Sequence, residues 1–157
     1  MNQGITELDA LTIESTPLSS SSSEVTQAWS VVSGEELEKA RSATIAETLK
    51  NQPGIRQTFF GPIANRPIIR GLDRHRVRML SNGVETFDFS ASSEDHAVSI
   101  DPMFIERIEL LRGSSALLYG SNAIGGAVNV IDRSIPNHPF DDSAGAIFRS
   151  GYTDVND

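Results

Sequence analysis

The glycine-rich stretch ERIELLRGSSALLYGSNAIGGAVNVID, residues 106–132, is the segment whose residue types most suggest chemistry. Glycines around a short helical turn between two strands are typical of phosphate-binding loops, with Ser114 as the predicted helix cap and Gly120 as its end. A loop of the Walker type needs a lysine directly after its second glycine, and the last lysine of the chain is Lys50. The G-x-G-x-x-G fingerprint of dinucleotide sites is missing as well. We therefore interpret the glycines as positions that need a positive φ angle or close approach of the backbone.

Nucleophilic catalysis finds equally little support. Ser114 and Ser115 have no histidine or carboxylate at a motif spacing, and the G-x-S-x-G elbow does not occur. The adjacent carboxylates Glu94 and Asp95 could act as an acid and a base, but nothing in the sequence isolates them from water. Because enzymes normally show at least one recognisable constellation, the sequence predicts that this protein is not an enzyme.

One polar loop could hold a metal ion. The segment SSEDHAVSIDP places Glu94, Asp95, His96 and Asp101 close together in sequence, whereas the other two histidines are isolated. Zinc binds nitrogen and oxygen ligands of this kind, usually four of them, and this loop would supply about two. The alternative is a solvated acidic loop, and the residues alone favour it, because such loops are common on protein surfaces.

Arginines form the clearest charge pattern. Residues 51–82 carry six basic side chains and one acidic side chain, in a chain whose net charge is −8. Arg74, Arg76 and Arg78 alternate, which predicts that they share one face of a strand. The acidic total argues against a nucleic-acid partner, and such basic segments are usually matched by acidic groups nearby. Arginine also suits desolvated pairing with carboxylates, which this chain need not supply itself.

Local signals predict the elements that position these groups. Ser33 with Glu36, and Thr44 with Glu47, are capping boxes that predict two short helices, the first ending near Ala40. Strands are predicted at 67–70, on both sides of the Asn-Gly turn at 82–83, at 105–111, with one apolar and one charged face, and at 127–131. Because these elements are short and interleaved, we expect an α+β fold, a small mixed β-sheet with short helices packed on it.

Both ends of the chain differ from this central part. A serine run at 19–23 predicts a flexible linker, and the alternation at 145–152 predicts a strand that is cut off in mid-course. The chain has no cysteine and no apolar run long enough for a membrane helix, so we expect the fragment to be soluble as it stands. The first residues do not resemble a signal peptide, so the protein is expected to be cytoplasmic or to have lost its leader.

Four segments carry a resemblance to a known family. LKNQPGI, RPIIRGL, VRMLSNGVE and IERIELLRGSSALLYGSNAIGGAVNVID together resemble the plug domain of TonB-dependent outer-membrane receptors, over roughly residues 30–135. The resemblance implies a flexible arm at 1–29, a plug domain at 30–140 and the truncated start of the first barrel strand at 141–157. It also implies an outer-membrane location, with the plug inside its own β-barrel and the arm in the periplasm.

The resemblance further implies partners for particular residues. Arg70 and Arg112, in the motifs IRG and LRG, would pair with carboxylates of the barrel. The arm resembles a TonB box, the extended segment that adds as a strand to the C-terminal domain of TonB. Its candidate residues are Leu8, Asp9, Ala10, Leu11, Thr12, Ile13 and Glu14.

The transported solute is predicted from the loop before the 105–111 strand. SNGVETFDFSASSEDHAVSIDP most resembles zinc-uptake receptors of the family, which makes Asp95 and His96 candidate zinc ligands. Zinc would then be the transported ligand, with its coordination completed by residues of the barrel, and no resident cofactor is expected. Two alternatives are a stand-alone periplasmic metal-binding module and the plug of a siderophore or haem receptor.

Overall fold

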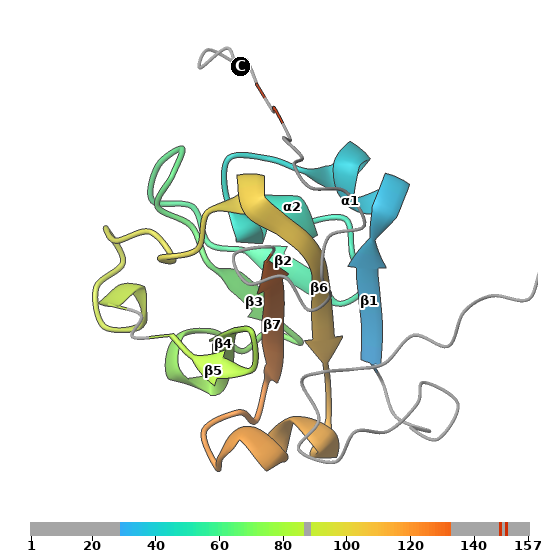
Figure 1. The fold of residues 1–157 in the computed structure, drawn as a ribbon. Helices are drawn as coiled ribbons and strands as arrows, with labels where there is room; N and C mark the ends of the chain where they lie inside the picture. The colour runs from blue at the N-terminus through green and yellow to red at the C-terminus, as the bar shows by residue number, and fades with distance from the viewer. Residues whose placement is uncertain (1–28, 87–88, 133–147, 149, 151–157) are drawn as a thin grey trace, which may run out of the picture.

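A computed structural model of the protein describes residues 29–86 and 89–132 and the single residues 148 and 150. Within these residues the chain forms a five-stranded mixed sheet, in the order β1-β6-β7-β4-β5, and a two-stranded sheet, β2-β3 (Figure 1). The strands are β1 (Trp29–Ser33), β2 (Ile55–Gln57), β3 (Pro67–Ile69), β4 (Val77–Ser81), β5 (Val84–Glu85), β6 (Ile105–Leu111) and β7 (Gly126–Asp132). The helices are α1 (Gly34–Ala40) and α2 (Ile45–Leu49), with short 3₁₀ turns at 74–76, 89–91, 102–104 and 114–119. The predicted α+β fold is confirmed.

The large sheet is mixed because one pair of its strands is parallel. β6 pairs antiparallel with β1 and β7, whereas β4 runs parallel to β7 with Val77 opposite Gly126. The β4–β5 hairpin turns at Asn82 and Gly83, whose φ angles are 51° and 80°. Positive φ at both positions is what a type I′ turn requires, so the predicted Asn-Gly hairpin is confirmed.

The main core lies between one face of the large sheet and a layer formed by α1, α2 and the small sheet. Its buried side chains are Val32, Leu37, Ile45, Leu49, Ile55, Ile69, Val77, Met79, Ile105, Ile108, Leu110, Val128 and Val130. Thr44 caps α2 as predicted, since its Oγ1 accepts a hydrogen bond from the Glu47 amide at 3.1 Å. Ser33 occupies the N-cap position of α1 as predicted, but its side chain makes no capping hydrogen bond, so the predicted capping box does not form. Ser33 is still a strand residue, paired with Arg107, and Gly34 makes the turn into the helix with a φ of 55°.

A second, smaller cluster closes the opposite end of the sheet. Figure 1 shows α1 and α2 where β1 ends and β6 begins, and the 3₁₀ helix 114–119 where β6 ends and β7 begins. The helix N-cap is Gly113 rather than the predicted Ser114, and the helix ends at Gly120 as predicted. A Cβ atom on Gly125 would lie 2.9 Å from the Arg76 carbonyl oxygen, and one on Gly126 2.7 Å from that of Leu111. Close backbone approach therefore explains these two glycines.

The prediction that three alternating arginines share a strand face was wrong. Arg74 and Arg76 belong to a 3₁₀ turn rather than a strand, closed by a hydrogen bond of 3.0 Å from the Arg76 amide to the Asp73 carbonyl. Only Arg78 lies on β4, so the three arginines do not share a strand face. The predicted charged face of β6 is present, because Arg107 and Glu109 lie on one face and contact each other at 3.2 Å, but Glu109 is only 1% exposed, so this face is buried.

Several predicted features fall outside the described residues. These are the TonB-box candidates at 8–14, the serine linker and most of the predicted barrel strand at 141–157. Among the described residues, no helix is both long and apolar enough to cross a membrane.

Candidate functional site

The fold brings together two arginines that are far apart in the sequence. Arg70 follows β3 with a φ angle of 53°, and Arg112 follows β6. Gly113 directly follows Arg112 in the chain, and Arg70 Nη1 lies 3.7 Å from the position that a Cβ atom on Gly113 would take. Burial, and then the charge of Arg70, lower the pKa of the Arg112 guanidinium. We call Arg70 and Arg112 the arginine corner.

The arginine corner has few acceptors within the described part of the chain. Arg112 donates a hydrogen bond through Nη2 to Ser30 Oγ on β1. Its Nε is buried and has no hydrogen-bond partner among the described residues. Neither arginine forms an ion pair with a described carboxylate, whereas Arg74 pairs with Glu94 and Arg78 with Glu85. The predicted matching of the basic segment by nearby acids therefore holds for some arginines and fails for this corner, which can accept an anion.

The predicted metal loop brings two of its four candidate groups together. His96 Nδ1 lies 2.9 Å from Asp95 Oδ1, and the side chains are 57% and 74% exposed. Hydrogen bonds from Ser93 and then from His96 hold the pKa of Asp95 below its usual value. Glu94 is paired with Arg74 instead, and Asp101 caps the turn at 102–104 through the Met103 amide at 2.9 Å.

This loop alone does not form a complete metal site. Among the described residues, no three histidines or carboxylates lie close enough together to hold a metal ion. Asp95 and His96 can offer two ligands of the usual four to zinc, as the sequence predicted.

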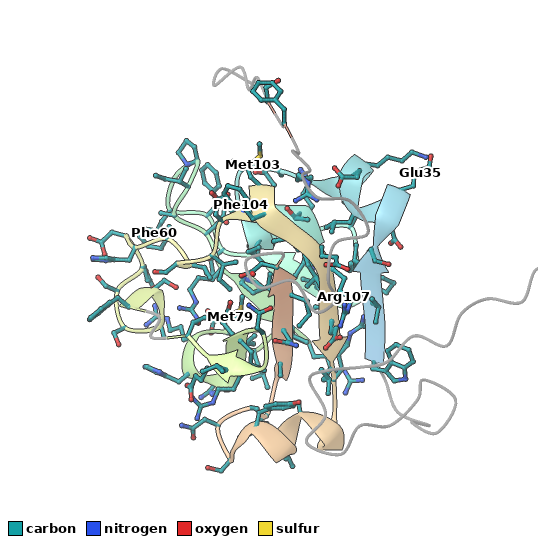
Figure 2. The ribbon with its side chains drawn as sticks, viewed as in Figure 1. Glu35, Phe60, Met79, Met103, Phe104 and Arg107 are labelled. Atoms are coloured by element: carbon teal, nitrogen blue, oxygen red, sulfur yellow. The ribbon has the colours of Figure 1, made fainter. Side chains whose placement is uncertain are left out.

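Exposed aromatic side chains form a feature that sequence reasoning missed. Phe59 and Phe60 on the β2–β3 loop are 71% and 60% exposed, and Phe104 before β6 is 63% exposed. Figure 2 shows Phe60 and Phe104 in its upper half, away from the 3₁₀ helix 114–119 at the bottom. Large apolar side chains that face solvent on loops commonly mark contact sites. The doubled phenylalanine in TFFGPI was the available signal.

A buried polar network crosses the sheet and was also missed. Glu109 on β6 lies opposite Asn129 on β7, and the Asn129 amide donates to its carboxylate at 3.0 Å. Arg107 Nε donates to the same carboxylate at 3.2 Å, and Asn129 Oδ1 accepts from the Gly83 amide at 2.9 Å. A single polar network therefore joins β6, β7 and the β4–β5 turn.

Comparison with known proteins shows the family to which this fold belongs. Residues 21–127 match the family described as TonB-dependent Receptor Plug Domain, which covers more than half of the chain. The chain belongs to this plug family. The match includes the arginine corner and the Asp95–His96 loop, but not the candidate TonB box at 8–14.

Relatives of the plug include receptors for several solutes. The chain is 40% identical over 103 residues to a vitamin B12 transporter, BtuB, of Photobacterium profundum, covering 65% of this chain and 17% of the relative. It is 28% identical over 148 residues to a hemin receptor of Yersinia pestis, covering 92% of this chain and 22% of the relative. The crystal structure of the siderophore receptor PirA from Acinetobacter baumannii has a TM-score of 0.58 and 27% identity, over 69% of this chain and 18% of that one.

The plug is therefore similar to one part of much longer proteins. The chain spans about a fifth of the length of the curated relatives it matches. These relatives are transporters and receptors rather than enzymes, and TonB-dependent receptors are outer-membrane proteins, which places the plug at the outer membrane.

Proposed function

We propose that this chain is the gate of an outer-membrane active-transport receptor that is energised through TonB. The observation that carries this proposal is the arginine corner, on a fold that belongs to the plug family. Two adjacent guanidinium groups without a described carboxylate are costly in isolation, because like charges and partial burial both disfavour them. Carboxylates on the inner wall of a surrounding barrel would neutralise both arginines and hold the plug in place.

The fold suits a gate that must open. β1 is an edge strand of the described sheet and holds to it through β6 alone, over five residues. Segments with few backbone partners open locally at a small free-energy cost. A pull on the chain before β1 would therefore reach an edge strand first, beside the arginine corner that Ser30 touches.

The energising partner can be tested directly. We propose that Leu8–Glu14 add as a strand to the C-terminal domain of TonB, and strand addition depends on backbone hydrogen bonds. Proline at Thr12 or Ile13 should abolish capture of the chain by immobilised TonB domain, because proline removes an amide donor. Proline at Gln3, outside the candidate box, is the matched control. Capture that survives both substitutions in the box would show that the box is elsewhere.

Two classes of solute are proposed, and each is favoured by a different group of side chains. The Asp95–His96 pair favours zinc, with the remaining ligands supplied by the barrel. The exposed Phe59, Phe60 and Phe104 favour a large organic metal complex instead, because flat apolar groups stack on aromatic side chains. The vitamin B12, hemin and siderophore names of the relatives support the second class.

Substitutions in the full-length receptor separate the two classes. Zinc transport predicts that Asp95→Ala with His96→Ala abolishes uptake, while Phe60→Ser has little effect. An organic complex predicts the reverse pattern. Calorimetry on the present chain adds a control: tight zinc binding without the barrel, lost in the Asp95 and His96 variants, would favour a stand-alone metal-binding module over a gate.

A further inference from the structure

A basic groove lies beside the arginine corner, at the end of the small sheet. It has a volume of about 450 Å³, and its lining includes Lys50 after α2, Arg56 on β2 and Arg70 after β3. Glycines and isoleucines of β2, β3 and their flanking turns form the rest of the lining, which contains no acidic side chain. We use the name basic groove for Lys50, Arg56 and Arg70.

The positive charge of the basic groove is largely unneutralised by the described residues. Lys50 Nζ lies 3.5 Å from Glu47 Oε1, in an exposed contact at the rim. Neither Arg56 nor Arg70 forms an ion pair with a described carboxylate, and Arg112 adds a further cation beside Arg70. A groove with this charge selects an acidic occupant, because exposed cations gathered on one surface attract anions and repel cations.

An acidic occupant is attached to the chain close by. Residues 1–28 contain four acidic side chains, Glu7, Asp9, Glu14 and Glu24, and no lysine or arginine. This arm joins the fold at the start of β1, where Ser30 Oγ accepts the hydrogen bond from Arg112. The arm therefore leaves the fold beside Arg112, and Arg112 lies beside the Arg70 side of the groove.

We propose that the N-terminal arm docks its acidic side chains in the basic groove of the same chain. Glu24 precedes Ser30 by six residues, which allows a reach of about 20 Å when extended. Glu14 precedes it by 16 residues, for which a serine-rich coil has a root-mean-square span of about 22 Å. Tethering at such lengths gives an effective concentration in the millimolar range, so weak ion pairs suffice for docking.

If the arm docks in the basic groove, the access of a binding partner to the arm depends on the ion pairs between the arm and the groove. Asp9 and Glu14 lie within the segment proposed for strand addition, so an arm held in the groove would be withheld from a partner. The intramolecular contact itself does not depend on TonB, and it can be measured whether or not TonB binds.

A nitroxide label on the arm tests the contact in the full chain. The sequence has no cysteine, so Ser20→Cys gives a single labelling site on the arm. We expect the label to broaden the amide signals of Gly54 and Gly71, which line the groove. Lys50→Glu combined with Arg56→Glu should reduce the docked population about fivefold, the effect of losing two exposed ion pairs. Salt near 1 M should have the same effect, because the screening length falls to about 3 Å.

The control is Arg76→Glu, which reverses an exposed arginine outside the lining of the groove. The broadening should persist in this variant. Absence of broadening at Gly54 and Gly71 would overturn the proposal and leave the groove to carboxylates of the barrel. The proposal would also be overturned if the broadening survives in Lys50→Glu with Arg56→Glu, or if it disappears equally in Arg76→Glu. Lys50→Glu and Arg56→Glu leave residues 8–14 and both arginines of the arginine corner unchanged, so capture by TonB remains a separate test of the proposed function.

Discussion

Removal of the Asn129 side chain should destabilise the plug strongly, because this residue holds the centre of the buried polar network. Asn129 is fully buried on β7. Its amide group donates to the Glu109 carboxylate at 3.0 Å and accepts from the Gly83 amide at 2.9 Å. Asn129→Ala therefore deletes one hydrogen bond to a charged group and one between neutral groups.

The expected cost follows from these two bonds. A hydrogen bond to a charged group contributes about 1.5–3 kcal/mol and a neutral one about 0.5–1.5 kcal/mol, so Asn129→Ala should lower the free energy of unfolding by about 3 kcal/mol. That is a large part of the about 5–15 kcal/mol expected for a domain of this kind. Urea unfolding followed by the fluorescence of the single tryptophan, Trp29 on β1, measures the change.

A double-mutant cycle identifies the source of the loss. Glu109→Gln retains an acceptor but removes the charge, so Asn129→Ala should cost less in that background, with a coupling energy of about 0.5–3 kcal/mol. Asn122→Ala is the matched control at an exposed position and should change stability by less than about 0.5 kcal/mol. A loss below about 1 kcal/mol for Asn129→Ala, or a coupling energy of zero, would refute the assignment of this network.

Four further outcomes are expected. Gly125→Ala should cost about 2–3 kcal/mol in urea unfolding, because its Cβ would meet a backbone oxygen at 2.9 Å, whereas Gly54→Ala, with open space and a φ of 75°, should cost about 1 kcal/mol. Arg112→Gln should leave the stability of the isolated chain unchanged or raise it by less than about 1 kcal/mol, since it relieves repulsion; a clear loss would mean that the corner is neutralised internally. Burial, and then the charge of Glu109, raise the pKa of Tyr119 to about 12, so the folded state favours the neutral phenol. The free energy of unfolding should therefore fall as the pH rises from about 10 to about 12, and Tyr119→Phe should not show this fall. Amide exchange should be faster in the edge strand β1 than in β7, and equal protection in the two strands would contradict the proposed order of opening.

Features set by local chemistry were predicted correctly from the sequence. The Asn82–Gly83 hairpin and the Thr44 cap depend on side chains within a few residues of the turn or helix end. Their geometry follows from backbone preferences that a short segment already contains. The resemblance of the RPIIRGL and LRGSSALLYGSNAIGG motifs to plug domains was also confirmed, and their glycines at 71, 113 and 120 have positive φ angles that few other residue types adopt.

Features set by strand register were not predictable in this way. The alternation of Arg74, Arg76 and Arg78 fits a strand, yet Arg74 has a φ angle of 54° and the Arg76 amide bonds to the Asp73 carbonyl, which the alternation does not reveal. Glu109 shares the charged face of β6 with Arg107, but the alternation does not reveal that this face is buried. Only the pairing of β6 with β7 places Asn129 opposite Glu109 and allows the carboxylate to be buried.

The position of the arginine corner connects these observations. Ser30 at the start of β1, Arg70 after β3 and Arg112 after β6 come from three separate segments, and they meet where the arm enters the fold. A force applied to the arm acts first on the pairing of Trp29 with Leu111, the residue before Arg112. Separation of β1 would then remove the hydroxyl acceptor of Arg112 before it disturbs the polar network on β7. Carboxylates that hold the corner in a barrel would therefore also hold β1, and the anchoring of the plug and its first step of opening would depend on the same side chains.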